Sequence, residues 1–189
     1  SGRGSNLAAL IEAQRRKELP IQIVGVFSDH ADCGAISLAQ AADIPVCALE
    51  ARDFPDRTEF DRATFAQVTA WKPDLIVLAG FMRVLGDDFV RHFEGRMINI
   101  HPSLLPSFAG LHTHRRALEA GVRLHGATVH FVTPTLDCGP IIIQGALAVS
   151  ADEDEEALAA QVLKIEHQIY PQAVRWFVEG RLRVVDGRV

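Results

Sequence analysis

The chain has 189 residues, of which 48% are hydrophobic and 23% charged, and its formal net charge is −5. This composition is typical of one globular domain. The negative net charge disfavours a nucleic-acid partner, which would contact a basic face. The apolar runs are shorter than the ~20 residues that span a membrane. The three cysteines, Cys33, Cys47 and Cys138, form no close pair, which disfavours a disulfide framework or a zinc cluster and favours the cytoplasm.

The first half of the chain alternates helical and apolar extended segments. Its opening stretch, SGRGSNL at 1–7, is typical of a strand-to-helix turn, and we expect an apolar strand of about five or six residues to precede it, outside these 189 residues. Hydrophobic spacing predicts helices over about 5–16, 34–42, 57–71 and 87–93, the first with Ser5 or Asn6 near its N-cap. Apolar runs predict buried strands over 21–27, 45–49 and 74–80, the last of the parallel type.

The second half of the chain changes character. A strand that carries Asn99 is followed by two extended runs, 124–132 and 140–149, which we expect to pair antiparallel. A long helix over about 153–178 has an apolar stripe and is capped by Gly180, and 182–185 is a candidate edge strand. The order of elements predicts an α/β fold in a single domain, with a doubly wound, mostly parallel sheet and an antiparallel C-terminal part.

Three polar residues are the strongest functional signal. Asn99 and His101 are two positions apart, so a strand directs both to one face, and Pro102 then ends the pairing of that strand. Open α/β sheets bind ligands at the carboxyl ends of their strands. Asp137 is the candidate partner that would favour the protonated form of His101. Each residue alone has a structural explanation, but an amide, an imidazole and a carboxylate together predict an acyl-transfer site.

The glycine-containing turn at the start of the chain predicts a phosphate site. It lacks the third glycine of a dinucleotide fingerprint and the Lys of a Walker A loop. The backbone N–H groups of Gly4, Ser5 and Asn6, at a helix N-terminus, are suited to a monophosphate. The alternative is a tight turn with a capping serine.

Two further groups have competing interpretations. Five of the eight histidines fall within thirty residues, which suggests zinc, but no Cys or carboxylate stands at ligand spacing around His112 and His114, so we expect no metal. Glu166 interrupts the apolar stripe of the last helix. It is either a solvated carboxylate on the helix flank or an acceptor for a hydroxylated or amine ligand.

These residues together make the chain similar to the folate-dependent formyltransferase family. The matching stretches are SGRGSNL at 1–7, LAGFMRVL at 78–85, INIHPSLLPSFAGLHTHRRALEAG at 98–121, HGATVHFVTPTLDCGPII at 125–142 and EHQIYP at 166–171. The first turn and the GLHTHR loop indicate the branch that formylates glycinamide ribonucleotide in purine synthesis. Methionyl-tRNA formyltransferase has an additional C-terminal domain, and formyltetrahydrofolate deformylase has an N-terminal regulatory domain and lacks both motifs.

The resemblance implies a role for each matching position. Residues 1–100 would form a phosphate-binding, Rossmann-like half and residues 101–189 a mixed half for folate and catalysis. His101, Asn99 and Asp137 would be catalytic. Glycinamide ribonucleotide would be bound by Gly4, Ser5, Asn6, Leu163, Lys164, Ile165 and Glu166. The folate would be bound by Arg57, Met82, Arg83, Val84, Leu85, Asn99, Thr133, Pro134, Thr135, Leu136 and Asp137.

The implied reaction moves a formyl group from 10-formyltetrahydrofolate, the co-substrate, to the glycinamide amine. No metal is required, because the amine itself attacks. The implied partners are small molecules, and the chain would act as a monomer or a homodimer. Two alternatives stay open: a 10-formyltetrahydrofolate hydrolase that uses water in place of the amine, and a non-catalytic module that binds a phosphate ester.

Overall fold

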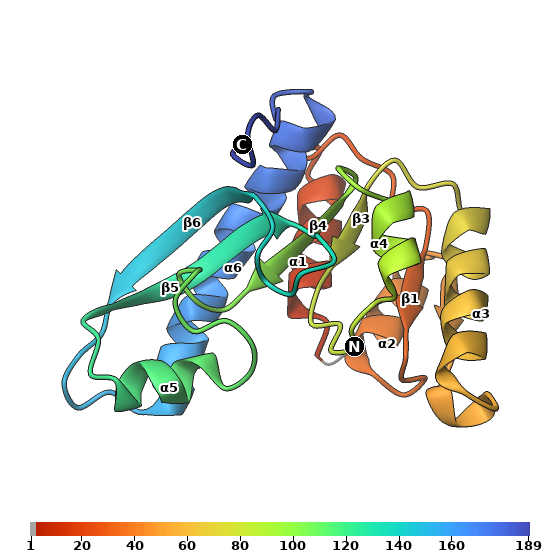
Figure 1. Ribbon diagram of the computed structural model, residues 1–189. Helices are drawn as coiled ribbons and strands as arrows, with labels where there is room; N and C mark the ends of the chain where they lie inside the picture. Colours follow the sequence, from red (N-terminus) through yellow and green to blue (C-terminus); the bar gives the residue numbers. More distant parts are fainter. Residues whose placement is uncertain (1–2) are drawn as a thin grey trace. The chain divides into compact units, whose positions relative to one another are not determined.

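The computed structural model describes residues 3–189, so the predictions that involve Ser1 and Gly2 lie outside the described residues. It divides into two compact units, residues 1–97 and residues 98–189, which are described in turn. Figure 1 shows the helices and strands in chain order.

The first unit contains short strands and the helices between them. The helices are α1 (Ser5–Arg15), α2 (Gly34–Ala41), α3 (Arg57–Ala70) and α4 (Asp87–His92), with a 3₁₀ turn η1 (Ala51–Asp53). The strands are β1 (Val26–Ser28), β2 (Val46–Ala48) and β3 (Ile76–Leu78). Strands β1 and β2 pair in parallel, with Val26 opposite Val46 and Ser28 opposite Ala48.

Local signals explain where the helices of this unit begin and end. The carboxylate of Asp56 accepts a hydrogen bond from the N–H of Glu59 and caps α3, as expected for an acidic N-cap. The helix buries Phe60 and Val68. Trp71, just after α3, covers the backbone at Gly25, where a Cβ atom would lie 2.5 Å from the indole ring.

The strands are shorter than predicted. The predicted strand over 21–27 was wrong at its N-terminal end, because only Val26–Ser28 are assigned to β1. A strand is defined by ladder hydrogen bonds to a neighbour, and the paired stretch of β2 is equally short. The predicted strands over 45–49 and 74–80 likewise shrink to β2 and β3.

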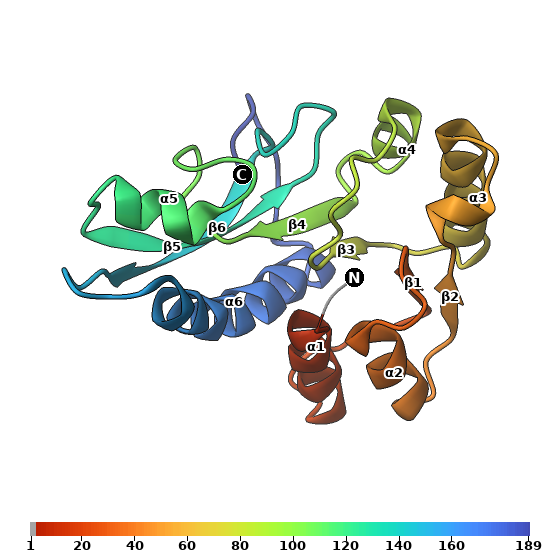
Figure 2. The same ribbon diagram turned by 90° about the horizontal axis from the view of Figure 1, so that it is seen from below.

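The second unit is an antiparallel sheet covered by a long helix. Strand β4 (Met97–His101) pairs with β5 (Leu124–Phe131), which pairs with β6 (Ile141–Ala148), and both pairings are antiparallel as predicted. A short helix, α5 (Thr113–Glu119), precedes β5, and α6 (Glu155–Val178) runs along β5 and β6, as Figure 2 shows.

Helix α6 closes the core of this unit. Its side chains Leu158, Val162 and Tyr170 are fully buried, and the Tyr170 hydroxyl donates to the carbonyl oxygen of Ile98 at 3.3 Å. The helix approaches β6 closely at Gly145, where a Cβ atom would lie 2.3 Å from Ile165. The hydrophobic stripe of the sequence therefore identifies the buried face correctly.

The ends of α6 have the expected caps. The carboxylate of Asp154 accepts from the N–H of Ala157 at 2.7 Å. Gly180, with a φ of 66°, donates its N–H to the Phe177 carbonyl at 2.9 Å and ends the helix. The predicted edge strand over 182–185 was wrong: Val185 forms only an isolated bridge with Arg188 across a tight turn. In the part of the chain from residue 3 onward, no helix is both long and apolar enough to cross a membrane.

Candidate active site

Strand β4 brings the first two predicted site residues to one face of the sheet. Asn99 lies opposite His130 and His101 lies opposite Thr128 in the pairing with β5. His101 is buried, with 7% of its surface exposed. The two-residue spacing of Asn99 and His101 therefore places their side chains on the face that also carries alternate residues of β5.

Asp137 lies in the loop between β5 and β6. The base of this loop is closed by a hydrogen bond from the N–H of Phe131 to the carbonyl of Pro140 at 2.9 Å. At Gly139 a Cβ atom would lie 1.7 Å from the carbonyl oxygen of Phe131, so only glycine fits. Asp137 itself has a φ of 52°, a conformation that aspartate tolerates better than most residues. Its side chain is only 6% exposed.

The structure joins Asp137 and His101. Oδ2 of Asp137 lies 3.5 Å from Nδ1 of His101 and also accepts the N–H of Gly110 at 2.9 Å. The other ring nitrogen of His101, Nε2, lies 3.1 Å from the carbonyl oxygen of Phe108. A carbonyl and an ionised carboxylate can only accept hydrogen bonds. Both nitrogens of His101 therefore face hydrogen-bond acceptors.

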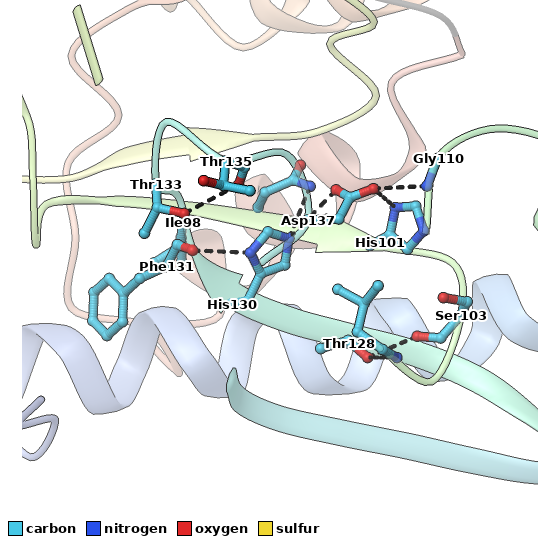
Figure 3. A network of polar contacts seen from close by, with 12 residues as sticks. Ile98, His101, Ser103, Gly110, Thr128, His130, Phe131, Thr133, Thr135 and Asp137 are labelled. Atoms are coloured by element: carbon cyan, nitrogen blue, oxygen red, sulfur yellow. Dashed lines mark hydrogen bonds and ion pairs between the residues drawn. The ribbon is translucent and has the colours of Figure 1, made fainter. Parts of the chain in front are cut away.

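A second histidine, His130 on β5, completes the network. Its Nδ1 lies 2.9 Å from the Phe131 carbonyl and therefore carries the proton. Its Nε2 lies 4.0 Å from Oδ1 of Asp137, and Figure 3 shows the Asp137 carboxylate between the two histidine rings. Burial lowers the pKa of His130, while the Phe131 carbonyl and Asp137 partly oppose that effect. His130 is thus a neutral ring with Nε2 free to accept.

His130 also contacts the side chain of Asn99. Its Nε2 lies 3.3 Å from the side-chain nitrogen of Asn99, so it accepts one amide N–H and fixes the direction of that amide. The signal that could have found it is cross-strand register: an antiparallel pairing that places Asn99 opposite His130 puts both side chains on one face.

Buried polar contacts hold the segment that follows His101. The hydroxyl of Thr128, which is fully buried, donates to the Ser103 carbonyl at 2.7 Å and accepts the N–H of Leu105 at 3.0 Å. The amide of Gln144 donates to the Leu105 carbonyl at 2.9 Å. Figure 3 shows Thr128 and Ser103 joined below the histidine rings. The backbone after β4 is therefore anchored to β5 and β6.

The predicted phosphate turn lies in the first unit. Gly4, which has no side chain, is the N-cap of α1 and has a φ of 75°. The capping serine of the alternative interpretation is therefore absent there. A Cβ atom at position 4 would lie 2.8 Å from Cα of Ala35, so glycine lets the turn pack against the start of α2. The N–H groups at the helix end are suited to an anion.

The predicted folate segment, Met82–Leu85, also lies in the first unit. Val84 and Leu85 line a small open hollow together with Phe60, Phe81 and Phe89. Arg57, the first residue of α3, donates from Nη2 to the carbonyl of Val84 at 2.9 Å. The structure therefore brings the predicted folate residues Arg57, Arg83, Val84 and Leu85 to one region of the first unit.

Helix α6 carries the remaining predicted ligand residues. Glu166 is 8% exposed, so its alternative interpretation as a solvated carboxylate on the helix flank was wrong. Burial, and second the charge of Glu166, raise the pKa of Tyr170 well above its usual range. Leu163 and Ile165 are half-buried and Lys164 is exposed. Within residues 3–189, no group of three or more His, Cys, Asp or Glu side chains is arranged to hold a metal ion.

A half-buried amide, a buried imidazole and a buried carboxylate at the carboxyl end of β4 and in a later loop define a site for acyl-transfer chemistry. The chain belongs to the formyl transferase family, whose model matches residues 1–174. It is 46% identical over 184 residues to phosphoribosylglycinamide formyltransferase of Escherichia coli (strain K12), covering 97% of this chain and 87% of that protein.

Solved structures agree with this assignment. Glycinamide ribonucleotide transformylase 1 from Symbiobacterium toebii matches with a TM-score of 0.97 and 42% identity, covering 100% of this chain and 89% of that one. A formyltetrahydrofolate deformylase from Pseudomonas syringae pv. tomato str. DC3000 matches with a TM-score of 0.92 but 32% identity, covering 99% of this chain and 62% of that one. The predicted α/β fold and the predicted family are confirmed.

Proposed function

We propose that the protein transfers the formyl group of 10-formyltetrahydrofolate to the amine of glycinamide ribonucleotide, in purine biosynthesis. The products are formylglycinamide ribonucleotide and tetrahydrofolate. The observation that carries the proposal is the buried contact between His101 and Asp137, beside the oriented amide of Asn99. The identity to the Escherichia coli formyltransferase over 97% of this chain supports the choice of substrates.

The chemical step is attack of the neutral amine on the formyl carbon. The carbon becomes tetrahedral and the formyl oxygen takes up negative charge. The imidazolium of His101 and the side-chain N–H of Asn99 that His130 leaves unused are the donors for this oxygen. Donors placed where charge develops contribute on the order of 10²–10³ in rate each. Substrate replaces the Phe108 carbonyl as the partner of His101 Nε2.

Asp137 has two tasks in this scheme. Its charge keeps His101 protonated, because an opposite charge within a few ångströms favours the imidazolium. The amine loses a proton and N10 of the folate gains one when the C–N10 bond breaks. His101, or a water held by Asp137, carries that proton. General acid–base help of this kind contributes about 10²–10⁴-fold.

The ribonucleotide is bound by residues from α1 and α6. The backbone N–H groups of Gly4, Ser5 and Asn6, at the start of α1, bind its phosphate. Glu166, with Leu163, Lys164 and Ile165, contacts the ribose and the glycinamide end. A buried carboxylate is suited to this task because it accepts hydrogen bonds from hydroxyl and amine groups.

The folate is bound by two loops. Backbone groups of Met82–Leu85 contact the edge of the pterin ring. The second loop contributes Thr133, Pro134, Thr135, Leu136 and Asp137. Asn99 lies beside the formyl group. Arg57 binds the carboxylate tail, since a guanidinium forms paired hydrogen bonds with carboxylates.

The same proposal covers the organisation and setting of the chain. It is a single formyltransferase domain, with residues 1–100 for phosphate binding and residues 101–189 for folate and catalysis. It acts as a monomer or homodimer in the cytoplasm. Support for a reducing compartment comes from Cys33, Cys47 and Cys138, which are all free thiols.

The test is incubation with 10-formyltetrahydrofolate, with and without glycinamide ribonucleotide, while both tetrahydrofolate and the formylated product are measured. A transferase releases tetrahydrofolate only when the ribonucleotide is present, in equal amount to formylglycinamide ribonucleotide. Equal release without the ribonucleotide, together with formate, would identify a hydrolase instead. Binding of the ribonucleotide with no loss of the formyl group would identify a non-catalytic module.

A further inference from the structure

The segment Met82–Leu85 has little burial to hold its shape. Met82 is 67% exposed and Val84 is 57% exposed. Segments with few buried apolar contacts open easily. A segment whose backbone groups contact a flat ring must nevertheless keep one conformation. If its hydrogen-bond donors and acceptors are displaced, the ring is bound less tightly. Polar contacts to this segment must therefore supply the rigidity that packing does not.

One such contact comes from Asp29, the residue directly after β1. Its carboxylate is 4% exposed, and Oδ2 accepts a hydrogen bond from Nε of Arg83 at 3.1 Å. The guanidinium of Arg83 also lies over the ring of Phe60, 5.0 Å from its centroid, and Phe60 is only 2% exposed. The charged end of Arg83 is thus held by a buried acid on one element and a buried ring on another.

The surroundings of Asp29 make this contact stronger than an ordinary surface ion pair. Its other basic neighbour, His30, has Nε2 at 3.7 Å from Oδ2 and is 66% exposed. A buried carboxylate needs a partner because its transfer out of water is costly, and a charge-assisted hydrogen bond is about twice as strong as a neutral one. Arg83 is therefore the principal partner of Asp29.

The second polar contact to the segment is weaker. Arg57 donates to the Val84 carbonyl at 2.9 Å, but its side chain is 66% exposed and its Nε lies 3.5 Å from Asp61. An exposed, shared guanidinium exchanges readily with water. It must also be available to the carboxylate tail of the folate. The lasting restraint on the segment is the contact at Asp29.

We infer that Asp29 is a positioning residue for folate binding: it holds Arg83, and through Arg83 the backbone of Met82–Leu85, in the conformation that accepts the pterin ring. The inference rests on the proposed function of that segment. Asp29 does not itself contact the reacting atoms. Its loss therefore weakens folate binding and leaves the chemical step and ribonucleotide binding unchanged.

The test is Asp29→Asn, which preserves the shape of the side chain and removes its charge. We expect the KM for 10-formyltetrahydrofolate to rise about tenfold, the size expected when one hydrogen bond to a charged group is lost. The KM for glycinamide ribonucleotide and kcat stay within about twofold. Amide hydrogen exchange over 82–86, measured without ligands, becomes faster in the variant.

A double-variant cycle shows whether Asp29 acts through Arg83. Arg83→Gln removes the surface partner and leaves the core intact, so it also serves if Asp29→Asn does not fold. We expect the double variant to raise the folate KM no further than the larger single effect, because both changes break one contact. If the folate KM of the double variant rises by the product of the two single increases, the inference is overturned.

Glu12→Gln is the control, since Glu12 forms ion pairs with the exposed residues Arg15 and Arg16 of α1, and both KM values should be unchanged. Equal increases in both KM values for Asp29→Asn, or no change in either, would make Asp29 merely structural. A wild-type protein without ribonucleotide-dependent transfer would instead refute the proposed function, so the two failures are distinguishable.

Discussion

Nε2 of His130 lies 3.3 Å from the side-chain nitrogen of Asn99. Nδ1 of His130 donates its N–H to the Phe131 carbonyl at 2.9 Å. In the neutral ring Nε2 therefore carries no proton and can accept from the amide. The amide is therefore oriented with one N–H toward His130 and the other available to substrate. A neutral histidine thus sets the direction of a hydrogen-bond donor in the site.

This relationship predicts non-additive kinetics. Asn99→Ala should lower kcat by about 10²–10³-fold, the usual cost of losing one oxyanion donor. His130→Ala leaves the amide in place but unoriented, so it should lower kcat by a smaller factor of about ten. The double variant should be no slower than Asn99→Ala, which steady-state kinetics of all three variants will check. A slower double variant would give His130 an independent role.

Removal of the charge at Asp137 should affect turnover more than binding. In Asp137→Asn the neutral amide no longer stabilises the imidazolium of His101, 3.5 Å away, so we expect kcat to fall about 10²–10⁴-fold. KM values for both substrates should change by less than about threefold. Single-turnover measurements with both substrates saturating test the prediction directly. Turnover close to wild type would exclude Asp137 from the mechanism.

The buried carboxylate of Glu166 should control ribonucleotide affinity. Glu166→Gln keeps its size, and loss of a charge-assisted hydrogen bond should weaken binding of glycinamide ribonucleotide by about tenfold, measured by calorimetry. Tyr170 supplies a second readout, because the charge of Glu166 contributes to its raised pKa. Unchanged affinity would leave Glu166 with a structural role beside Tyr170. Glu156→Gln, on the exposed start of α6, is the matched control.

Substitution at the first turn should damage both stability and phosphate binding. In Gly4→Ala the new Cβ would lie 2.8 Å from Cα of Ala35, and the backbone would keep a φ of 75°. Strain of this kind costs about 1–3 kcal/mol, which urea unfolding can measure. Gly95→Ala is a control for the conformational part, since Gly95 also has a positive φ but has nothing within 4 Å. An equal decrease in unfolding free energy for Gly4→Ala and Gly95→Ala would argue against a special packing role for Gly4.

Stability should fall on mild acidification because of His125. Burial first, then the nearby His114 and His101, lower its pKa to about 4, whereas an unfolded histidine titrates near 6.5. Between those pH values His125 is therefore protonated in the unfolded state but stays neutral in the native state. Linkage then predicts a loss on the order of 2–3 kcal/mol as the pH falls from about 6.5 to about 4.

His125→Gln is the variant that checks this pH dependence. Its unfolding free energy should decrease less than that of the wild type over the same pH range. Some decrease will persist, because burial also lowers the pKa values of His114, His130 and His167. Parallel curves for variant and wild type, from urea titrations at several pH values, would contradict the prediction.

Local signals in the sequence predicted the helices well. The predicted limits of α1, α2, α3 and α6 differ from the observed ones by at most two residues, because caps and hydrophobic spacing are properties of neighbouring residues. Strand limits depend on partners that are distant in sequence. For that reason the predicted strand over 21–27 was too long, and the apolar run at 182–185 has no ladder partner.

The same distinction applies to the site. The spacing of Asn99 and His101, the glycine turn and the acid of the Asp137 loop are visible in the sequence. The position of His130 opposite Asn99 and the carbonyl of Phe108 beside His101 are not, because they depend on strand register and on a left-handed backbone at Phe108, whose φ is 55°. Three-dimensional pairing therefore supplied the residues that orient the predicted ones.

The loop that presents Asp137 also exposes a thiol at the next position, Cys138. Cys33 and Cys47 are partly buried by comparison. The most exposed thiol for a maleimide dye therefore lies one residue away from the Asp137 carboxylate. The molecule carries a built-in attachment point from which ligand entry could be followed in real time.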